Sequence, residues 1–352
     1  MKIQLKELIK SLKGIQLIGN DDIPISGIEY DSRRIKPGML FAAINGYKMD
    51  GKSFIPDAVS NGAVAILTDR PINSDLPVIV ADSPRQTMAD LAARFYDYPG
   101  EKMNIIGVTG TNGKSTSVYL IKKILETAGQ KTGMLNSLTY DTTDKVYKAE
   151  RTTPESVDVQ KFLYEMKQAG CKYGVVEVSS HALVLNRVEN IGFKVGLFTT
   201  FSRDHLDFHH TMEEYLAVKK LFLKKLEGKY KCAVINNDAP EFAAFADDAK
   251  CPVVTYSTTG TADVMIRSAA LLAEASTFEL MTPRGNRKMS VKLLGRYNLS
   301  NMAGAAAVGL ALQIDLEKIV QALEAAKPVP GRFHPVNMGQ PFTVLVDYAH
   351  TP

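Results

Sequence analysis

Strand-like and helix-like patterns of apolar residues alternate along the chain between residue 101 and about residue 327. Apolar runs typical of buried strands occur over Ile105–Thr109, Tyr173–Val178, Gly196–Phe201, Ala233–Ile235 and Val253–Tyr256. Helical patterns fill several of the stretches between these runs. Such alternation predicts an α/β fold with a mainly parallel sheet flanked by helices, and it places ligands at the carboxyl ends of the strands.

The two ends of the chain have a different character. Residues 1–100 contain short strand-like runs and one helical stretch, over Met39–Ile44, Ala63–Leu67, Val78–Val80 and Thr87–Tyr96. They predict a small N-terminal α/β domain. The Pro-rich stretch Lys327–Gly331 predicts a stiff connector, and a further strand is expected over Phe342–Val346. We therefore expect three parts, with bounds 1–100, 101–327 and 328–352.

Composition fits a multidomain enzyme rather than a nucleic-acid or membrane protein. The 352 residues suffice for two or three domains, and 45% of them are hydrophobic. The net charge of +4 is spread along the chain, which predicts no nucleic-acid surface. The N-terminus has the spacing of an amphipathic helix, with apolar residues at Leu5, Leu8, Ile9 and Leu12, and it lacks the unbroken apolar stretch of a signal peptide. The weakly polar stretch 303–312 is too short to span a bilayer. Three cysteines without a C-x-x-C motif favour a reduced, cytoplasmic compartment.

The strongest chemical signal is a phosphate-binding loop between a predicted strand and a predicted helix. Its residues are Gly110, Thr111, Asn112, Gly113, Lys114, Ser115 and Thr116. Glycines allow the tight turn, and successive N–H groups then face a phosphate at the helix N-terminus. Lys114 would neutralise phosphate charge, and the hydroxyl of Ser115 or Thr116 would bind Mg²⁺. The general motif has Gly at position 108, whereas this chain has Val108 and a glycine one position earlier.

Polar side chains follow two further predicted strands. Glu177 ends one apolar run, and His205 follows the next. Both would reach a phosphate-bound cation from the opposite side, although an acidic residue at a strand end is often only solvated or salt-bridged. His205 and His209 also have helical H-x-x-x-H spacing, but the sequence lacks the glutamate of a zincin, so zinc is disfavoured.

A helix is predicted over Thr211–Glu227, with Tyr215, Val218, Phe222 and Leu226 facing inward. Lys219 and Lys220 lie within it. On composition alone, both lysines are expected to be surface charges.

Several motifs, in order along the whole chain, together resemble those of the Mur ligases. They are GTNGKST, EVSSHAL, SRDHLDFH followed by YLAVKKLF, GRYNLSN, PGRF and DYAHTP. Glycine at position 107 is also typical of this family. Within the family, the chain most resembles the members that add the third residue of the cell-wall precursor peptide.

The resemblance implies a substrate site for UDP-N-acetylmuramoyl-L-alanyl-D-glutamate. The N-terminal residues that match the uridine-binding part are Tyr30, Ser32, Tyr47, Lys48 and Met49. The residues that match those holding the muramoyl-dipeptide end are Thr152, Thr153, Ser179 and Arg187.

The resemblance also implies an ATP and metal site with two Mg²⁺ ions. Glu177 and His205 match metal ligands of the family, and they join the hydroxyl of Ser115 expected from the phosphate loop. Lys219 matches a lysine that carries a CO₂-derived carbamate, which reverses the expectation from composition. Asn298, Arg332 and Asp347 match contacts to adenine, γ-phosphate and ribose. The catalytic residues implied are Lys114, Lys219 and His205.

The implied reaction is ATP-driven amide formation through an acyl phosphate, with L-lysine or meso-diaminopimelate as the incoming amine. The implied protein is a bacterial, cytoplasmic, monomeric enzyme of peptidoglycan biosynthesis, and so of cell shape and division. The family has a further C-terminal domain of which residues 328–352 would be only the start, so the activity of these 352 residues alone is left open. A folylpolyglutamate synthetase, a Mur ligase of another step and a non-catalytic nucleotide-binding fragment are the alternatives.

Overall fold

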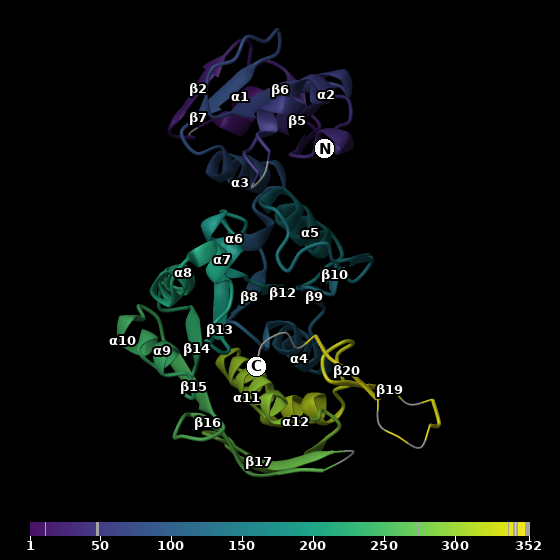
Figure 1. Ribbon diagram of the computed structural model, residues 1–352, viewed down its shortest axis with the longest axis vertical. Coiled ribbons are helices and arrows are strands. Elements are labelled where there is room, and N and C mark those ends of the chain that lie inside the picture. The colour runs from purple at the N-terminus through teal and green to yellow at the C-terminus, as the bar shows by residue number, and fades with distance from the viewer. Residues whose placement is uncertain are drawn as a thin grey trace. The chain divides into compact units, whose positions relative to one another are not determined.

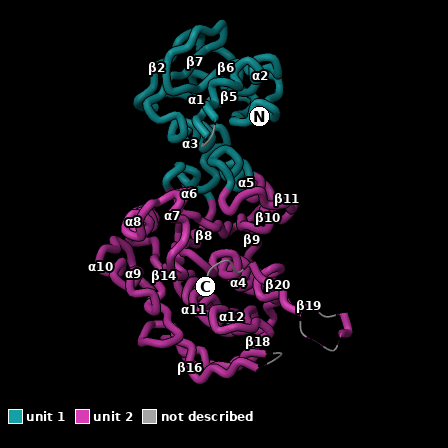
Figure 2. Tube along the Cα trace, viewed as in Figure 1, with its two compact units in different colours: residues 1–102, 154–164, 184–191 teal, residues 103–153, 165–183, 192–352 magenta. Residues whose placement is uncertain are grey.

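The computed structural model describes residues 1–10, 12–46, 49–272, 275–336, 338–340, 342 and 344–348. The chain forms two compact units (Figure 2). The first contains residues 1–102, 154–164 and 184–191, and the second contains residues 103–153, 165–183 and 192–352. The first unit is therefore completed by two segments from later in the chain.

The first unit is built on a five-stranded sheet in the order β2-β7-β6-β5-β4. The strands are β2 (Ile15–Ile18), β4 (Gly27–Glu29), β5 (Met39–Ala42), β6 (Ala63–Thr68) and β7 (Val78–Ala81). All neighbouring pairs are parallel except β2 with β7. The predicted runs at Met39–Ile44, Ala63–Leu67 and Val78–Val80 are thus confirmed as strands.

Shorter elements surround this sheet. They are β1 (Ile3–Gln4), β3 (Pro24–Ile25), α1 (Leu5–Ile9), α2 (Ile55–Ser60), α3 (Pro84–Phe95), and the 3₁₀ turns Ser32–Arg34, Gly51–Phe54 and Pro99–Glu101. Leu5 and Leu8 are fully buried, as their helical spacing predicted. Helix α3 begins three residues before its predicted start because Pro84, at its first position, has a φ suited to a helix N-terminus.

The second unit is built on an eleven-stranded sheet in the order β11-β10-β9-β12-β8-β13-β14-β15-β16-β17-β18. The bounds are β8 (Asn104–Thr109), β9 (Thr132–Leu135), β10 (Thr139–Asp141), β11 (Val146–Lys148), β12 (Tyr173–Glu177), β13 (Phe193–Phe198), β14 (Cys232–Asn236), β15 (Val253–Ser257), β16 (Val264–Leu271), β17 (Ser276–Thr282) and β18 (Gly285–Val291). In this order, all neighbouring strands between β9 and β16 pair in parallel. The strands at the two ends pair antiparallel: β11 with β10, β10 with β9, β16 with β17, and β17 with β18. The predicted mainly parallel sheet flanked by helices is confirmed.

Strand β13 differs from its prediction at both ends. It begins at Phe193 and ends at Phe198, whereas Gly196–Phe201 was expected. Phe193 is buried and lies opposite Ile105 of β8, so the strand starts earlier. Thr199 and Thr200 leave the strand because they hydrogen-bond to the phosphate loop.

The helices of the second unit cover both faces of its sheet (Figure 1). The bounds of the remaining elements are α4 (Lys114–Thr127), α5 (Ser156–Gln168), α6 (Ser180–Val184), α7 (Leu206–His209), α8 (Met212–Lys224), α9 (Pro240–Ala243), α10 (Phe245–Asp248), α11 (Arg296–Ala311), α12 (Leu316–Glu324), β19 (His334–Val336) and β20 (Val344–Val346). Helices α4, α11 and α12 share one apolar core with residues of the sheet. The apolar stretch 303–312 belongs to α11 and its end, and among the described helices none is long and apolar enough to cross a membrane.

Helix α8 packs on the other face of the sheet because two glycines admit it. Gly107 of β8 and Gly196 of β13 lie opposite each other in the parallel ladder. A Cβ added to Gly107 would lie 2.4 Å from Cζ of Phe222, and one added to Gly196 would lie 2.4 Å from Cδ1 of Leu226. The glycine at position 107 therefore has a packing role, which also brings the buried face of α8 close to the end of β8.

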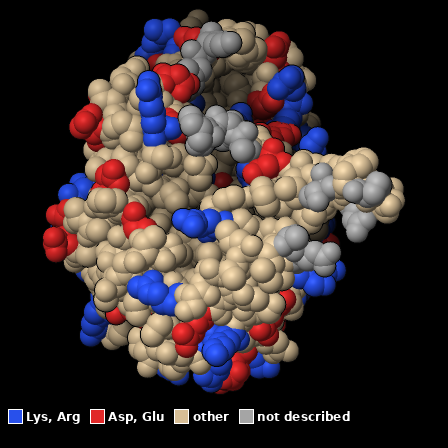
Figure 3. All heavy atoms as spheres, turned by 60° about the horizontal axis from the view of Figure 1, so that its bottom comes forward, with Lys and Arg blue, Asp and Glu red and all other residues tan. Residues whose placement is uncertain are grey.

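Surface charges of both signs are interspersed. Figure 3 shows basic and acidic side chains alternating over short distances on the face that it presents. This distribution agrees with the small net charge.

Candidate functional site

The phosphate loop lies between β8 and α4, as the sequence predicted. Gly110 has φ +146° and Gly113 has φ +84°, which are conformations that favour glycine. A Cβ on Gly110 would lie 1.9 Å from Oγ1 of Thr199, and one on Gly113 would lie 2.3 Å from Oδ1 of Asn301. The loop is thus clamped between the end of β13 and the start of α11.

The end of β13 holds the first part of the loop by hydrogen bonds. The N–H of Thr111 donates to the carbonyl of Thr200, and the N–H of Asn112 donates to Oγ1 of Thr200. Oγ1 of Thr199 donates to the carbonyl of Asn112. The amides of Lys114, Ser115 and Thr116 form the first turn of α4, where N–H groups have no acceptor within a helix and can bind an anion.

A cavity of about 780 Å³ opens over the loop within the second unit. Its lining includes many of the residues singled out from the sequence: Thr111, Asn112, Gly113, Lys114, Ser115, Thr116, Thr152, Glu177, His205, Arg332 and Asp347. Other described lining residues were not predicted, among them Ser137, Arg151, Asp204, Tyr297 and Asn301. The fold therefore collects distant segments of the sequence around one space large enough for a nucleotide.

Lys114 is held inside the loop. Its Nζ donates to the carbonyls of Gly110 at 3.1 Å and Thr111 at 2.6 Å. Burial lowers the pKa of Lys114, while the carboxylates of Glu177 and Asp204 act in the opposite direction. The lysine lies where it would meet the phosphates of a nucleotide bound at the helix N-terminus.

Glu177 and Ser115 form the part of the cavity best suited to Mg²⁺. Glu177 is 2% exposed, and its Oε2 accepts hydrogen bonds from Oγ of Ser115 and from the N–H of Ser137, both at 3.0 Å. Carboxylate and hydroxyl oxygens are the hard ligands that Mg²⁺ prefers, and it takes few of them from the protein when phosphates supply the rest. The donor set therefore fits the ion. Among the described residues, no group of three or more His, Cys, Asp or Glu side chains is placed to hold a metal ion. The phosphates of a nucleotide would therefore have to supply the remaining ligands of the Mg²⁺.

Lys219 is buried, contrary to the expectation from composition. Its side chain lies on the inner face of α8 and is 1% exposed, whereas Lys220 is partly exposed and paired with Asp248. Nζ of Lys219 donates to the carbonyl of Gly110 at 3.1 Å and lies 4.7 Å from the ring centroid of Tyr215. Burial and the nearby charge of Lys114 lower the pKa of Lys219 well below its usual value. Burial therefore favours the neutral form of this amine next to the loop.

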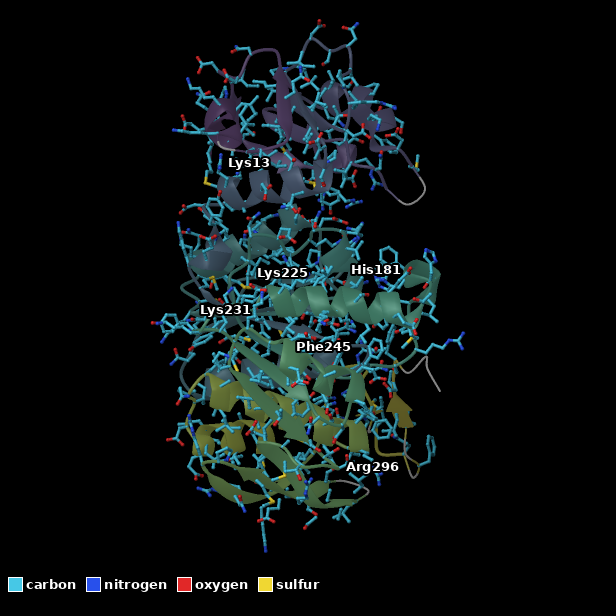
Figure 4. All side chains as sticks on the ribbon, turned by 90° about the vertical axis from the view of Figure 1, so that its left-hand side faces the viewer. Lys13, His181, Lys225, Lys231, Phe245 and Arg296 are labelled. Atoms are coloured by element: carbon cyan, nitrogen blue, oxygen red, sulfur yellow. The ribbon has the colours of Figure 1, made fainter. Side chains whose placement is uncertain are left out.

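His205 lines the cavity and caps α7 with φ +54°. Burial lowers its pKa, which favours the neutral imidazole that binds metals. His209 has a different environment: it is buried, its Nε2 lies 2.8 Å from Oγ of Ser180, and burial lowers its pKa to about 4. His205 lines the cavity, whereas His209 is buried behind it, and the ring of His181, labelled in Figure 4, packs against both.

The residues matched to the muramoyl-dipeptide end lie in both units. In the second unit, Thr152 lines the cavity, and Oγ1 of Thr153 donates to the carbonyl of Glu177 at 2.7 Å and lies 3.3 Å from Oγ of Ser179. In the first unit, Nη2 of Arg187 lies 2.7 Å from Oε1 of the buried Glu155.

The residues matched to the uridine site belong to the first unit. The hydroxyl of Tyr30 donates to Oδ2 of Asp158 at 2.6 Å, and Ser32 is buried at the start of a 3₁₀ turn. Met49 is exposed. Tyr47 and Lys48 lie outside the described residues.

The three residues matched to ATP contacts differ in position. Arg332 and Asp347 line the cavity, and Nη2 of Arg332 donates to Oγ of Ser115 at 3.4 Å. Asn298 is not among the described lining residues: its Nδ2 donates to the carbonyl of Leu294, and its Oδ1 accepts from Asn301. Asn301, which belongs to the same GRYNLSN motif, lies between Asn298 and the loop and itself lines the cavity.

Two family models match large parts of the chain. The Mur ligase middle domain matches residues 108–309, and the catalytic domain of the Mur ligase family matches residues 24–96. The chain is 38% identical over 356 residues to the UDP-N-acetylmuramoyl-L-alanyl-D-glutamate--2,6-diaminopimelate ligase of Bacillus licheniformis. It is 40% identical over 355 residues to the enzyme of that name from Geobacillus kaustophilus. Each match covers 99% of this chain and 73% of the relative.

A solved structure with the same enzyme name superimposes on the whole chain. The TM-score is 0.83 and the sequence identity 26%, and the match covers 100% of this chain and 72% of the other. The similarity therefore extends over both units.

Proposed function

Because the chain belongs to the Mur ligase family, a family of ATP-dependent ligases, we propose that it joins a diamino acid to UDP-N-acetylmuramoyl-L-alanyl-D-glutamate. The observation that carries the proposal is the cavity in which the phosphate loop, Glu177, His205 and Arg332 meet. The names of the relatives favour 2,6-diaminopimelate, the amine expected above in its meso form, over L-lysine.

The chemistry is the activation of a carboxylate by ATP. The γ-carboxylate of the D-glutamyl residue attacks the γ-phosphorus of ATP, ADP leaves, and an acyl phosphate remains. The amine of the diamino acid then attacks the acyl carbon, and phosphate leaves with formation of the amide. Lys114 and Arg332 stabilise negative charge on the transferring phosphoryl group, where positioning and electrostatics provide most of the catalysis.

The metal positions follow from the donor set. Ser115 and Glu177 would hold one Mg²⁺, and His205 with a modified Lys219 would hold a second. These ions supply charge neutralisation at the phosphates when bound. The chain's own part is to keep Glu177 fixed between Ser115 and Ser137, and to favour the neutral form of His205 by lowering its pKa through burial.

Each part of the chain would have its own binding role. Residues 1–100 would bind the uridine nucleotide, residues 101–327 would bind ATP, and residues 328–352 would begin a C-terminal ligase domain. Thr152, Thr153, Ser179 and Arg187 would hold the muramoyl-dipeptide end, and Asp347 the ribose. We further propose a cytoplasmic monomer acting in peptidoglycan synthesis, and thereby in cell shape and division.

Substrate profiling tests this function. Sustained ADP release is expected when UDP-N-acetylmuramoyl-L-alanyl-D-glutamate and meso-diaminopimelate are both present. L-lysine is the matched alternative amine, and it should not support this release. Release driven by a folate with glutamate would instead indicate a folylpolyglutamate synthetase. Release driven by the muramoyl tripeptide with D-alanyl-D-alanine would indicate another Mur step. Nucleotide binding without ADP release with any of these substrates would indicate a non-catalytic nucleotide-binding module.

We also propose that Lys219 carries a carbamate. The neutral amine attacks the carbon of CO₂, a C–N bond forms, and one proton is released, so that a cationic side chain becomes a carboxylate ligand for Mg²⁺. The buried position of Lys219 supports this step because only an uncharged amine is nucleophilic.

Labelled bicarbonate tests the modification. A ¹³C carbamate signal is expected in the unchanged chain and in Lys220→Ala, and it should be absent in Lys219→Ala. Lys220 is the matched control because it is the next residue of the same helix but forms a surface ion pair. A carbamate signal that survives in Lys219→Ala would refute the assignment.

A further inference from the structure

A serine that the sequence analysis did not single out stands at the centre of the Mg²⁺-binding side of the cavity. Ser137 lines the cavity, and its backbone and its hydroxyl both contact site residues. Its N–H donates to Oε2 of Glu177 at 3.0 Å, and its Oγ lies 2.8 Å from Oγ of Ser115 and 3.3 Å from Nη2 of Arg332.

The direction of these hydrogen bonds follows from the number of protons. Oγ of Ser115 has one proton, and the carboxylate Oε2 of Glu177 can only accept, so this proton goes to Glu177. The hydroxyl of Ser137 must then donate to Oγ of Ser115. Arg332, which can only donate, reaches both hydroxyl oxygens. A single ordered chain therefore runs from Arg332 through Ser137 and Ser115 to Glu177.

The fold holds Ser137 in this position. Strands β9 and β12 are parallel neighbours, with Leu135 opposite Val176, so the residues after β9 lie beside Glu177 at the end of β12. Oδ1 of Asn136, which is 1% exposed, accepts hydrogen bonds from the N–H groups of Leu138 and Thr139. This Asx-type turn fixes the backbone around Ser137.

We propose that Ser137 is a positioning residue for the metal ligands: its hydroxyl orients Ser115 and Glu177 so that a divalent cation bound with a nucleotide diphosphate or triphosphate meets preset oxygens. The inference rests on the proposed function, because it requires a nucleotide–metal complex in this cavity. Removing a group that orients metal ligands typically lowers metal affinity about 10- to 100-fold.

The test uses the 352-residue chain and Mn²⁺ as a paramagnetic substitute for Mg²⁺. Binding of Mn²⁺ in the presence of ADP is measured by electron paramagnetic resonance, and binding of ADP without metal by calorimetry. Ser137→Ala is expected to weaken Mn²⁺ binding about 10- to 100-fold and to leave metal-free ADP binding unchanged. Ser137→Thr, which keeps a hydroxyl, should bind Mn²⁺ like the unchanged chain.

Two controls separate this role from a general loss of structure. Ser290→Ala makes the same change on the exposed part of β18 and should alter neither affinity. Ser137→Cys, of similar size but with a weak donor, should behave like Ser137→Ala. Equal Mn²⁺ affinity in Ser137→Ala and the unchanged chain would overturn the inference, as would a parallel loss of metal-free ADP binding. Failure of the unchanged chain to bind Mn²⁺ with ADP would overturn the proposed function itself.

Discussion

Lys114→Ala is expected to lower the rate of ADP formation about 10²- to 10³-fold, the usual cost of removing one charge-stabilising donor. Nζ of Lys114 contacts only loop carbonyls among its described hydrogen-bond partners, at Gly110 and Thr111, so its loss should not disturb the core. The melting temperature without nucleotide should therefore change little. Rates come from a coupled ADP assay, and ATP affinity from calorimetry.

Lys123→Ala is the matched control for Lys114→Ala. Lys123 belongs to the same helix, α4, but is not among the described residues of the cavity lining. Its replacement should leave rate and ATP affinity within about twofold of the unchanged protein, as expected for a surface change away from any site. If Lys114→Ala also kept both quantities, Lys114 would not be a phosphate-binding residue.

The parts of the site that could be predicted from the sequence are those encoded by local spacing. The phosphate loop follows an apolar strand and precedes a helical pattern within a few residues, and Glu177 directly ends a buried strand. Parallel pairing of β8 and β12 then brings them together without further information. The mainly parallel sheet was predictable for the same reason.

The parts that were missed depend on contacts between distant segments. Ser137 follows a strand of only four residues, too short to stand out as an apolar run, and its role depends on Glu177 and Arg332. The burial of Lys219 depends on Gly107 and Gly196, which let α8 approach the sheet. The antiparallel strand β17 was missed although its alternating burial pattern is typical of a half-buried strand.

The phosphate-loop glycine directly before helix α4 provides the second large effect. Gly113→Ala should destabilise the fold through two additive costs. A left-handed backbone costs a residue with a Cβ about 1–2 kcal/mol, and Gly113 has φ +84°. The new Cβ would also lie 2.3 Å from Oδ1 of Asn301, a buried side chain held by Asn298. Overpacking of this kind costs about 1–3 kcal/mol.

Gly170→Ala separates these two costs. Gly170 has φ +79°, close to that of Gly113, but a Cβ there would meet nothing within 4 Å. This variant should therefore lose only the backbone cost of about 1–2 kcal/mol and keep its ATP affinity. Gly113→Ala should lose more stability in urea unfolding, and it should also bind ATP weakly, because relief of the contact with Asn301 moves the N–H groups at the start of α4. Equal loss of stability in the two variants, with ATP affinity preserved in both, would show that Asn301 does not fix the geometry of the loop.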